Sequence, residues 1–221
     1  MEVSLIATNA EDAPNSLDLL VVNAARVSFG KRKSALDEAD KKLLVYLAKN
    51  KHMVPFRHPQ ITLHIKCCDT VARQFMKHIV GGEHAHKDAP WSEISGRYIE
   101  YKSFEYPVLR KQAKNVKQGS SDEPAGELAQ AIYKNTIDVV KKAYQELLDL
   151  DVCKEQARML LPFATETEFW VTGSLEYWFH FVHLRKDTHA QKEIQVVANE
   201  VEKVCSSLAK YSWEALTEAS S

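Results

Sequence analysis

The segment Gln60-Ile61-Thr62-Leu63-His64-Ile65-Lys66 alternates apolar and polar side chains without interruption. Apolar residues occupy every second position from Ile61 to Ile65, so they share one face of an extended chain. This pattern predicts a strand with one face buried against a core and the other face polar. Residues Glu2 to Ala7 predict a second short strand. We therefore expect a small antiparallel sheet.

Helical periodicity dominates the rest of the chain. Helices are predicted over residues 17–27, after a cap at Asp37, from Asp69 onward and over residues 127–150. In the last third, Val171, Leu175, Trp178 and Val182 recur at steps of four, three and four residues. Residues Ile194 to Val204 repeat the pattern. These signals predict that the last third is nearly all helix.

Proline, glycine and polar residues mark the predicted connections, which cover residues 52–59, 81–90 and 111–124. No repeat or linker divides the chain. The fold class we predict is therefore α+β, mostly helical with a small antiparallel sheet, as a single domain over residues 1–221.

The formal net charge is only −1, so no overall field attracts the chain to nucleic acid or to an anionic membrane. A phosphate-bearing ligand must then be held by a local basic site. The N-terminus lacks a signal-peptide pattern, and no apolar run reaches the roughly 18 residues of a membrane span. The four cysteines form no CxxC pair, which suits a reducing compartment. We expect a cytoplasmic protein, or one in the host cytoplasm if it is phage-encoded.

The best candidate for phosphate binding is Ser95-Gly96-Arg97, which offers a hydroxyl, an approachable backbone and a planar cation. From composition alone, a polar loop in which Arg97 pairs with a nearby carboxylate is the favoured alternative. Arg158 lies between Ala157 and the apolar run Met159-Leu160-Leu161, so it is either snorkelling or buried against a ligand. Arg185 ends an apolar helix, where a cation also complements the helix dipole.

Two other groups carry weaker signals. His84 and His86, with Asp88, are spaced for chelation, but an exposed loop without a metal is the favoured interpretation. Cys67 and Cys68 lie at a strand end with nothing nearby to activate a thiolate, so we interpret both as packing residues.

Six segments together resemble the flavin-dependent thymidylate synthases, in family order and across most of the chain. They are Ala24-Ala25-Arg26-Val27-Ser28, Pro55-Phe56 with His52 and His58, Val71-Ala72-Arg73-Gln74, Ser92-Glu93-Ile94-Ser95-Gly96-Arg97-Tyr98, Ala157-Arg158 with Leu161-Pro162, and Leu184-Arg185 with His189-Ala190-Gln191.

The family signature is an Arg-His-Arg triplet, a short spacer and then Asn-Glu-x-Ser-x-Arg-Tyr. This chain departs from the first half of that signature. The triplet is here Lys77-His78-Ile79, and the spacer is extended by Gly82 to Pro90. Val54 and Glu176 stand where the family often has a hydroxyl and a basic residue. These differences fall on residues that would face the flavin.

The resemblance implies a role for named residues. Arg185 would be catalytic, against the uracil edge, where its charge favours negative charge on the ring as C5 becomes nucleophilic. The residues that would bind dUMP are Gln74, Lys77, Glu93, Ser95, Gly96, Arg97, Arg158 and Arg185. The residues that would bind FAD are Ser28, His52, Val54, Lys77, His78, Ile79, Glu93, Ser174 and His180.

The resemblance also implies FAD as cofactor, with NADPH and methylenetetrahydrofolate as co-substrates, in a homotetramer whose subunits share active sites. The implied reaction forms dTMP from dUMP and needs no cysteine nucleophile. Two alternatives remain open from the sequence. One is a hydroxymethyl product, as in phage nucleotide modification, and the other is a dUMP-binding protein without flavin.

Overall fold

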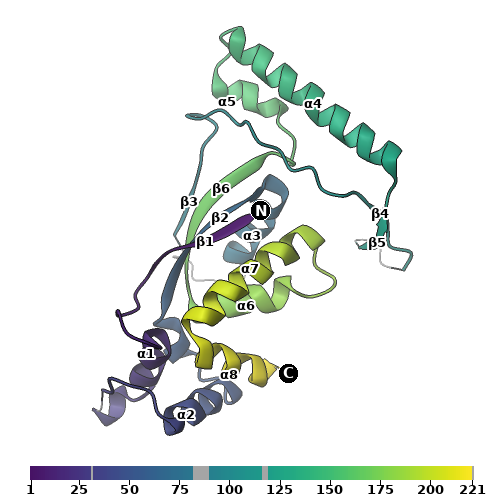
Figure 1. Cartoon of the computed structure of the whole chain (residues 1–221). Coiled ribbons are helices and arrows are strands. Elements are labelled where there is room, and N and C mark those ends of the chain that lie inside the picture. The colour runs from purple at the N-terminus through teal and green to yellow at the C-terminus, as the bar shows by residue number, and fades with distance from the viewer. Residues whose placement is uncertain (31, 82–89, 116–118, 221) are drawn as a thin grey trace.

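A computed structural model describes residues 1–30, 32–81, 90–115 and 119–220 (Figure 1). Its centre is a four-stranded sheet in the order β1-β2-β6-β3, in which every neighbouring pair is antiparallel. The strands are β1 (Glu2–Thr8), β2 (Gln60–Cys68), β3 (Trp91–Glu93) and β6 (Glu166–Ser174). The alternating segment at residues 60–66 therefore lies in the middle of the sheet. The predicted α+β fold is confirmed.

The helices surround this sheet and form an arm at one end of it. They are α1 (Ser16–Ala25), α2 (Glu38–Lys49), α3 (Asp69–Gly81), α4 (Glu127–Asp149), α5 (Lys154–Ala157), α6 (Leu175–Arg185), α7 (Lys192–Leu208) and α8 (Lys210–Ser220). Short 3-10 turns occupy Val27–Phe29, Val54–Arg57 and Arg158–Leu160. Within the described residues, no helix is both long enough and apolar enough to cross a membrane.

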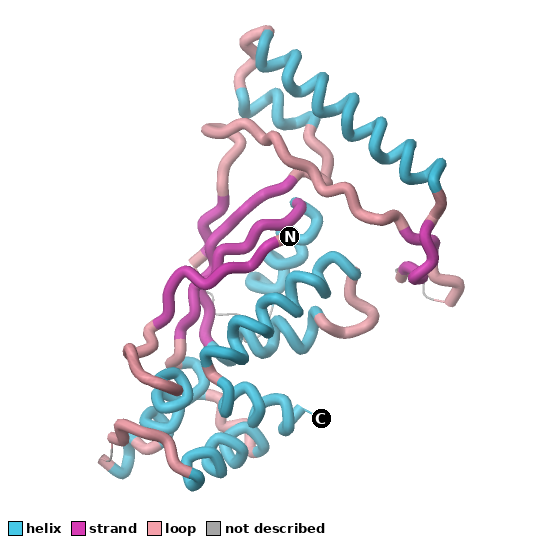
Figure 2. The backbone as a smooth tube through the Cα atoms, in the orientation of Figure 1, coloured by secondary structure: helices cyan, strands magenta, loops and turns pink. Residues whose placement is uncertain are grey.

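One face of the sheet carries the core. Ile61, Leu63 and Ile65 are fully buried on β2, and Val171 lies opposite Leu63 on β6. Helices α3, α6 and α7 cover this face, as the tube in Figure 2 shows. The other face is polar and includes the hydrogen bond of 2.9 Å between Thr62 and Thr172. The period of two along β2 thus separates core from surface, as the sequence predicts.

The prediction that the last third is nearly all helix was wrong for β6. Val171 belongs to this strand, and the helical spacing that links it to Leu175 crosses the boundary between β6 and α6. Thr167, Phe169 and Val171 are buried at alternate positions, which is the strand signal. Ser174 ends the strand and caps α6, because its Oγ accepts a hydrogen bond of 3.1 Å from the Tyr177 backbone N–H.

Two segments without a predicted strand contain regular structure. Residues 111–124 are predicted as a loop, but β4 (Arg110–Gln112) and β5 (Ser120–Pro124) form a hairpin there. Trp91–Glu93, for which the sequence predicts no strand, forms β3. All three strands are short, and β4 and β5 are mostly polar and exposed, so they lack the apolar alternation that marks a strand.

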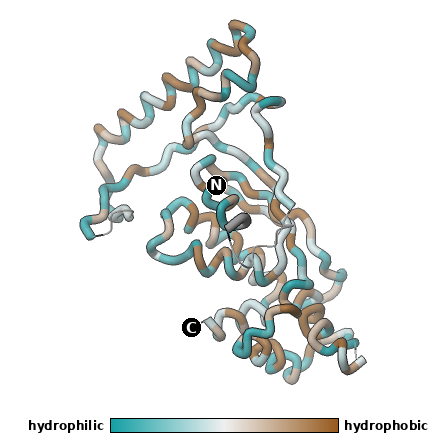
Figure 3. The backbone as a smooth tube through the Cα atoms, turned by 180° about the vertical axis from the view of Figure 1, so that it is seen from behind, coloured by the Kyte–Doolittle hydropathy of each residue, from teal (hydrophilic) through white to brown (hydrophobic). Residues whose placement is uncertain are grey.

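Helix α4 lies in the arm at the end of the sheet, next to α5 (Figure 1). Its apolar residues include Leu128, Ile132 and Val139, which are 76, 59 and 67% exposed. Figure 3 shows apolar stretches along this helix when the molecule is seen from behind. A single chain therefore leaves an apolar face of α4 uncovered.

Candidate active site

A first group of predicted site residues lies where β3 ends and the Arg158–Leu160 turn begins. We call Glu93, Ser95, Gly96, Arg97 and Arg158 the Arg158 cluster. A pocket of about 270 Å³ opens here, with Glu93 and Arg158 in its lining. The Glu93 carboxylate is fixed on both sides, because it accepts hydrogen bonds from Thr167 Oγ1 at 2.6 Å and from Trp91 Nε1 at 3.2 Å.

Gly96 is required by close packing. A Cβ at this position would lie 2.4 Å from Cε2 of Tyr101 and 3.1 Å from Cδ of Arg158. The 2.4 Å distance is too short for two carbon atoms and the 3.1 Å distance is tight, so any side chain would displace the ring and push on the arginine stem. The absent side chain therefore lets the Arg158 stem lie against the backbone of the turn.

The two arginines of the cluster differ in their partners. Arg97 Nε lies 3.4 Å from Glu155 Oε2, with both side chains more than half exposed. This is the pairing expected for a simple polar loop, but an exposed ion pair is weak and leaves Arg97 available to a ligand. Among the described residues, the Arg158 side chain has neither an ion pair nor a hydrogen bond, although the carboxylates of Asp69 and Glu93 line the same pocket. Arg158 is thus a half-buried cation whose hydrogen-bond donors are available to a ligand.

A second group lies between α3 and α6, and we call Gln74, His78, Tyr177, His180 and Arg185 the Arg185 cluster. Arg185 Nη2 donates to the backbone carbonyl of Gln74 at 3.3 Å. The ring of His78 lies 5.2 Å from that of His180 and 5.6 Å from that of Tyr177, between ring centroids. The buried Arg185 Nε and Tyr177 hydroxyl have no hydrogen-bond partner among the described residues.

Unpaired buried donors are costly, and a ligand with carbonyl oxygens would satisfy them. Burial also lowers the pKa of Arg185, but a guanidinium starts so high that it stays charged at neutral pH. The Arg185 cluster therefore presents a fixed positive charge next to aromatic rings. A planar heterocycle fits that chemistry.

His78 is 6% exposed, and burial, with the nearby charges of His180 and Arg185, lowers its pKa to about 4. The unfolded chain therefore binds a proton between pH 6.5 and 4 that the folded chain does not. The stability contributed by neutral His78 is complete above pH 6.5 and is lost as the pH falls toward 4. We predict that His78→Gln reduces the drop in melting temperature between about pH 7 and about pH 5, measured by calorimetry. An unchanged drop would contradict this prediction.

Comparisons with known proteins identify the family of this chain. A family model described as "thymidylate synthase complementing protein" matches residues 10–209. The flavin-dependent thymidylate synthase of Pseudothermotoga lettingae is 36% identical over 198 residues, covering 89% of this chain and 84% of that protein. The enzyme of the same name from Thermus thermophilus is 34% identical over 203 residues, covering 91% and 72%. The chain belongs to the flavin-dependent thymidylate synthase family.

A solved structure supports this membership. The crystal structure of a UMP/dUMP methylase, PolB from Streptomyces cacaoi, bound with 5-Br dUMP, matches with a TM-score of 0.80 and 27% identity. The match covers 98% of this chain and 94% of that one. The fold match therefore extends over nearly all of the chain.

In this synthase-family chain, the residues predicted for dUMP divide between the two clusters, except for Lys77, which is exposed on α3 and belongs to neither. Gln74, Lys77 and Arg185 do not line the pocket that contains Arg158. The division occurs within α3, where Arg73 pairs with Asp69 and lines the pocket while the next side chain, Gln74, bonds Gln191 at 2.5 Å. One chain thus holds the predicted dUMP contacts in separate groups. It does not bring all of them to one pocket.

The residues predicted for the synthase flavin come from several elements. Ser28 lies in the exposed turn after α1, and His52 and Val54 are exposed just before and at the start of the Val54–Arg57 turn. Ser174 is the buried cap of α6, whereas Glu93 is in the Arg158 cluster. Lys77 is exposed on α3, the helix that also contains His78 and Ile79. His84, His86 and Asp88 lie outside the described residues.

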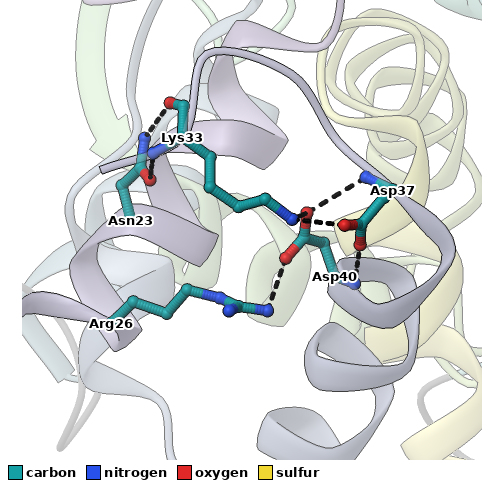
Figure 4. A network of polar contacts seen from close by, with 5 residues as sticks. All are labelled: Asn23, Arg26, Lys33, Asp37 and Asp40. Carbon is teal, nitrogen blue, oxygen red and sulfur yellow. Dashed lines mark hydrogen bonds and ion pairs between the residues drawn. The ribbon is translucent and has the colours of Figure 1, made fainter. Parts of the chain in front are cut away.

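A charged network holds the turn that carries Ser28 (Figure 4). Asp40 is fully buried and accepts from Arg26 Nη2 at 2.6 Å and from Lys33 Nζ at 2.5 Å. Asn23 exchanges two hydrogen bonds with the backbone of Lys33, and Asp37 caps α2 as the sequence predicts. The network therefore ties α1, the following connection and α2 together around one carboxylate.

Three residues near the clusters were missed by the sequence prediction. Tyr101 packs on Gly96, and Tyr177 contributes the unpaired hydroxyl. Arg57 pairs with Glu176. One indication of this pair was present in the sequence, which is that Glu176 departs from the family pattern. The cysteine prediction is confirmed for Cys67 and Cys68, which are 0 and 5% exposed, and burial raises the pKa of both thiols.

Proposed function

We propose that this enzyme methylates C5 of dUMP to give dTMP, with methylenetetrahydrofolate as carbon donor, FAD as cofactor and NADPH as reductant. The observation that carries the proposal is Arg158, a cation without a partner among the described residues, whose stem packs on a glycine turn beside a pocket. The names of the relatives and the dUMP analogue bound to PolB support this substrate, and they favour a methyl over a hydroxymethyl product.

The nucleotide phosphate would be bound by Arg158 with the turn at Ser95, Gly96 and Arg97. A guanidinium and closely approachable backbone N–H groups suit a phosphate, and the glycine makes that approach possible. Glu93 is held by two donors, so its carboxylate is fixed for a contact with the nucleotide. Gln74 of the Arg185 cluster and the exposed Lys77 on α3 would complete the contacts.

Arg185 would act on the uracil ring. Its unpaired Nε–H and its charge favour negative charge on the ring as C5 attacks the one-carbon unit. The buried rings of His78 and Tyr177 lower the local polarity on one side of Arg185, which strengthens this interaction. Since burial raises the pKa of Cys67, Cys68 and Cys205, none of these three thiols is an activated nucleophile, as the proposed reaction requires.

The Arg185 cluster fits a flavin ring, because it combines aromatic side chains with buried donors that lack partners among the described residues. The residues that would hold FAD are Ser28, His52, Val54, Lys77, His78, Ile79, Glu93, Ser174 and His180. When bound, FAD supplies the redox chemistry. The protein orients the groups, and the neutral His78 adds no charge to that site.

We also propose a homotetramer with shared active sites. Two features support it: the predicted dUMP contacts are divided between two clusters, and α4 exposes Leu128, Ile132 and Val139. Partner subunits would cover this face and complete each pocket. Sedimentation of the purified protein measures the number of subunits.

The experiment is product analysis with dUMP, methylenetetrahydrofolate, FAD and NADPH. We expect a product with the mass of dTMP and a flavin absorbance band in the purified protein. A hydroxymethyl product, or protein that binds dUMP but no flavin, would contradict the proposal.

Arg158→Ala is expected to weaken dUMP binding about 10- to 100-fold, because a charge-assisted phosphate contact is lost. A calorimetric titration with dUMP measures the change. Unchanged affinity would refute the phosphate assignment.

A further inference from the structure

Arg57 and Glu176 form an ion pair that the sequence alone does not reveal. Arg57 ends the Val54–Arg57 turn, and Glu176 lies in the first turn of α6. Nε of Arg57 donates to one carboxylate oxygen and Nη2 donates to the other at 3.2 Å. The Glu176 side chain is 8% exposed and that of Arg57 is 41% exposed. The acid is therefore inside and the cation faces outward.

The ion pair neutralises the buried carboxylate at position 176. Glu176 stands where the family often has a basic residue, so it replaces a cation by a buried anion. A buried carboxylate without a partner is strongly unfavourable, and it would also repel an anionic ligand. Glu176 raises the pKa of Arg57, as expected for two charges in direct contact. The guanidinium thus neutralises the acid.

Arg57 still has hydrogen bonds to offer. A guanidinium carries about five N–H donors, and Glu176 uses one on Nε and one on Nη2. The remaining donors have no partner among the described residues, and the Arg57 side chain is 41% exposed, so a ligand can reach them. A planar cation held in this way is suited to phosphate oxygens.

The pair also lies among the residues proposed for the flavin. His52 and Val54 belong to the same turn or closely precede it, and Ser174 caps the helix that carries Glu176. The turn is rigid, because Phe56 is fully buried and the carbonyl of Arg57 accepts a bond of 2.7 Å from Gln60 Nε2. Helices α1 and α6 both pack against it. The cation therefore has a defined direction relative to these residues.

We propose that Arg57, oriented by Glu176, is a cofactor-binding residue that contacts the diphosphate of FAD. Position 176 carries an acid in place of the family's basic residue. Arg57 supplies the missing cation from the neighbouring turn. This inference rests on the proposed function, because it assumes that FAD is the cofactor.

Two variants separate ligand binding from a purely structural ion pair. Arg57→Gln leaves Glu176 buried without a partner, so it should lower both the melting temperature and the affinity for FAD. The double variant Arg57→Gln/Glu176→Gln removes both charges, so the melting temperature should recover. Its affinity for FAD should remain about 10- to 100-fold below that of the unmodified protein, because the cation is still missing. Full recovery of FAD affinity in the double variant would overturn the inference.

The contact with phosphate is tested by fluorescence titration of flavin-free protein with FAD and with riboflavin, which has no phosphate. The double variant should bind riboflavin as the unmodified protein does, and an equal loss for both ligands would overturn the inference. Arg32→Gln, which removes an exposed arginine paired with Glu11, is the control and should change neither affinity. If the unmodified protein itself binds no FAD, the proposed function fails, which is a distinct result.

Discussion

Replacing Arg185 with alanine is expected to slow dTMP formation by about 100- to 1,000-fold, the usual effect of removing one fixed donor to a developing negative charge. The side chain has an unpaired Nε, and its Nη2 donates to the carbonyl of Gln74. Since no described acid pairs with Arg185, its removal leaves no buried anion uncompensated. The melting temperature should therefore stay within a few degrees of its original value, while single-turnover rates fall.

Arg185→Lys is the matched control for this prediction. It keeps a positive charge but loses the planar fork, so its rate should fall between that of the alanine variant and that of the unmodified enzyme. A rate for Arg185→Ala near normal would exclude Arg185 from the ring. A large loss of stability in the same variant would assign it a structural role.

Asp40→Ala is expected to lower the free energy of unfolding by about 3 kcal/mol, because Arg26 loses its ion pair and Lys33 keeps only the exposed Asp37. The carboxylate is fully buried, whereas the side chains of Arg26 and Lys33 are each 27% exposed. Water can rehydrate the two cations in part. The loss of stability should therefore lie at the lower end of the range for broken buried ion pairs. Denaturant titration measures this difference.

A control for Asp40 lies two residues away on the same helix. Glu38 pairs with Lys41 at 2.7 Å, but the Glu38 side chain is 81% exposed. Such surface pairs contribute about 0 to 1 kcal/mol, so Glu38→Ala should change the stability little. Equal effects of the two substitutions would show that burial of the network does not matter. The Asp40 variant should also bind flavin more weakly, since Ser28 lies in the turn held by Arg26.

Sequence periodicity predicted the parts of the fold that depend on local spacing. The strand at Gln60, the capped helix after Asp37 and the long helix from Glu127 all follow from such patterns. Strand β6 was missed because its inward positions, including Val171, continue into a helix at a spacing that also fits about 3.6 residues per turn. When a strand passes directly into a helix and the apolar residues of both face the same core, periodicity alone cannot locate the boundary between them.

The sequence proposes a set of candidate site residues, but it does not give their geometry. Motifs identified Arg158 and Arg185, yet only the fold shows that they belong to separate groups on either side of α3. The reason is that Arg73 and Gln74, adjacent in sequence, project in different directions around a helix. The Arg57–Glu176 pair joins residues far apart in the chain, so no local pattern could reveal it.

The order of strands in the sheet also has a consequence for synthesis of the chain on the ribosome. Strand β2 pairs with β6, which lies roughly 100 residues later, so the central pairing closes a long loop. Until β6 has emerged, the nascent chain carries β2 with an open edge and an apolar face that lacks α6 and α7. Such surfaces bind chaperones or aggregate. Productive folding of the core therefore has to wait for the last quarter of translation.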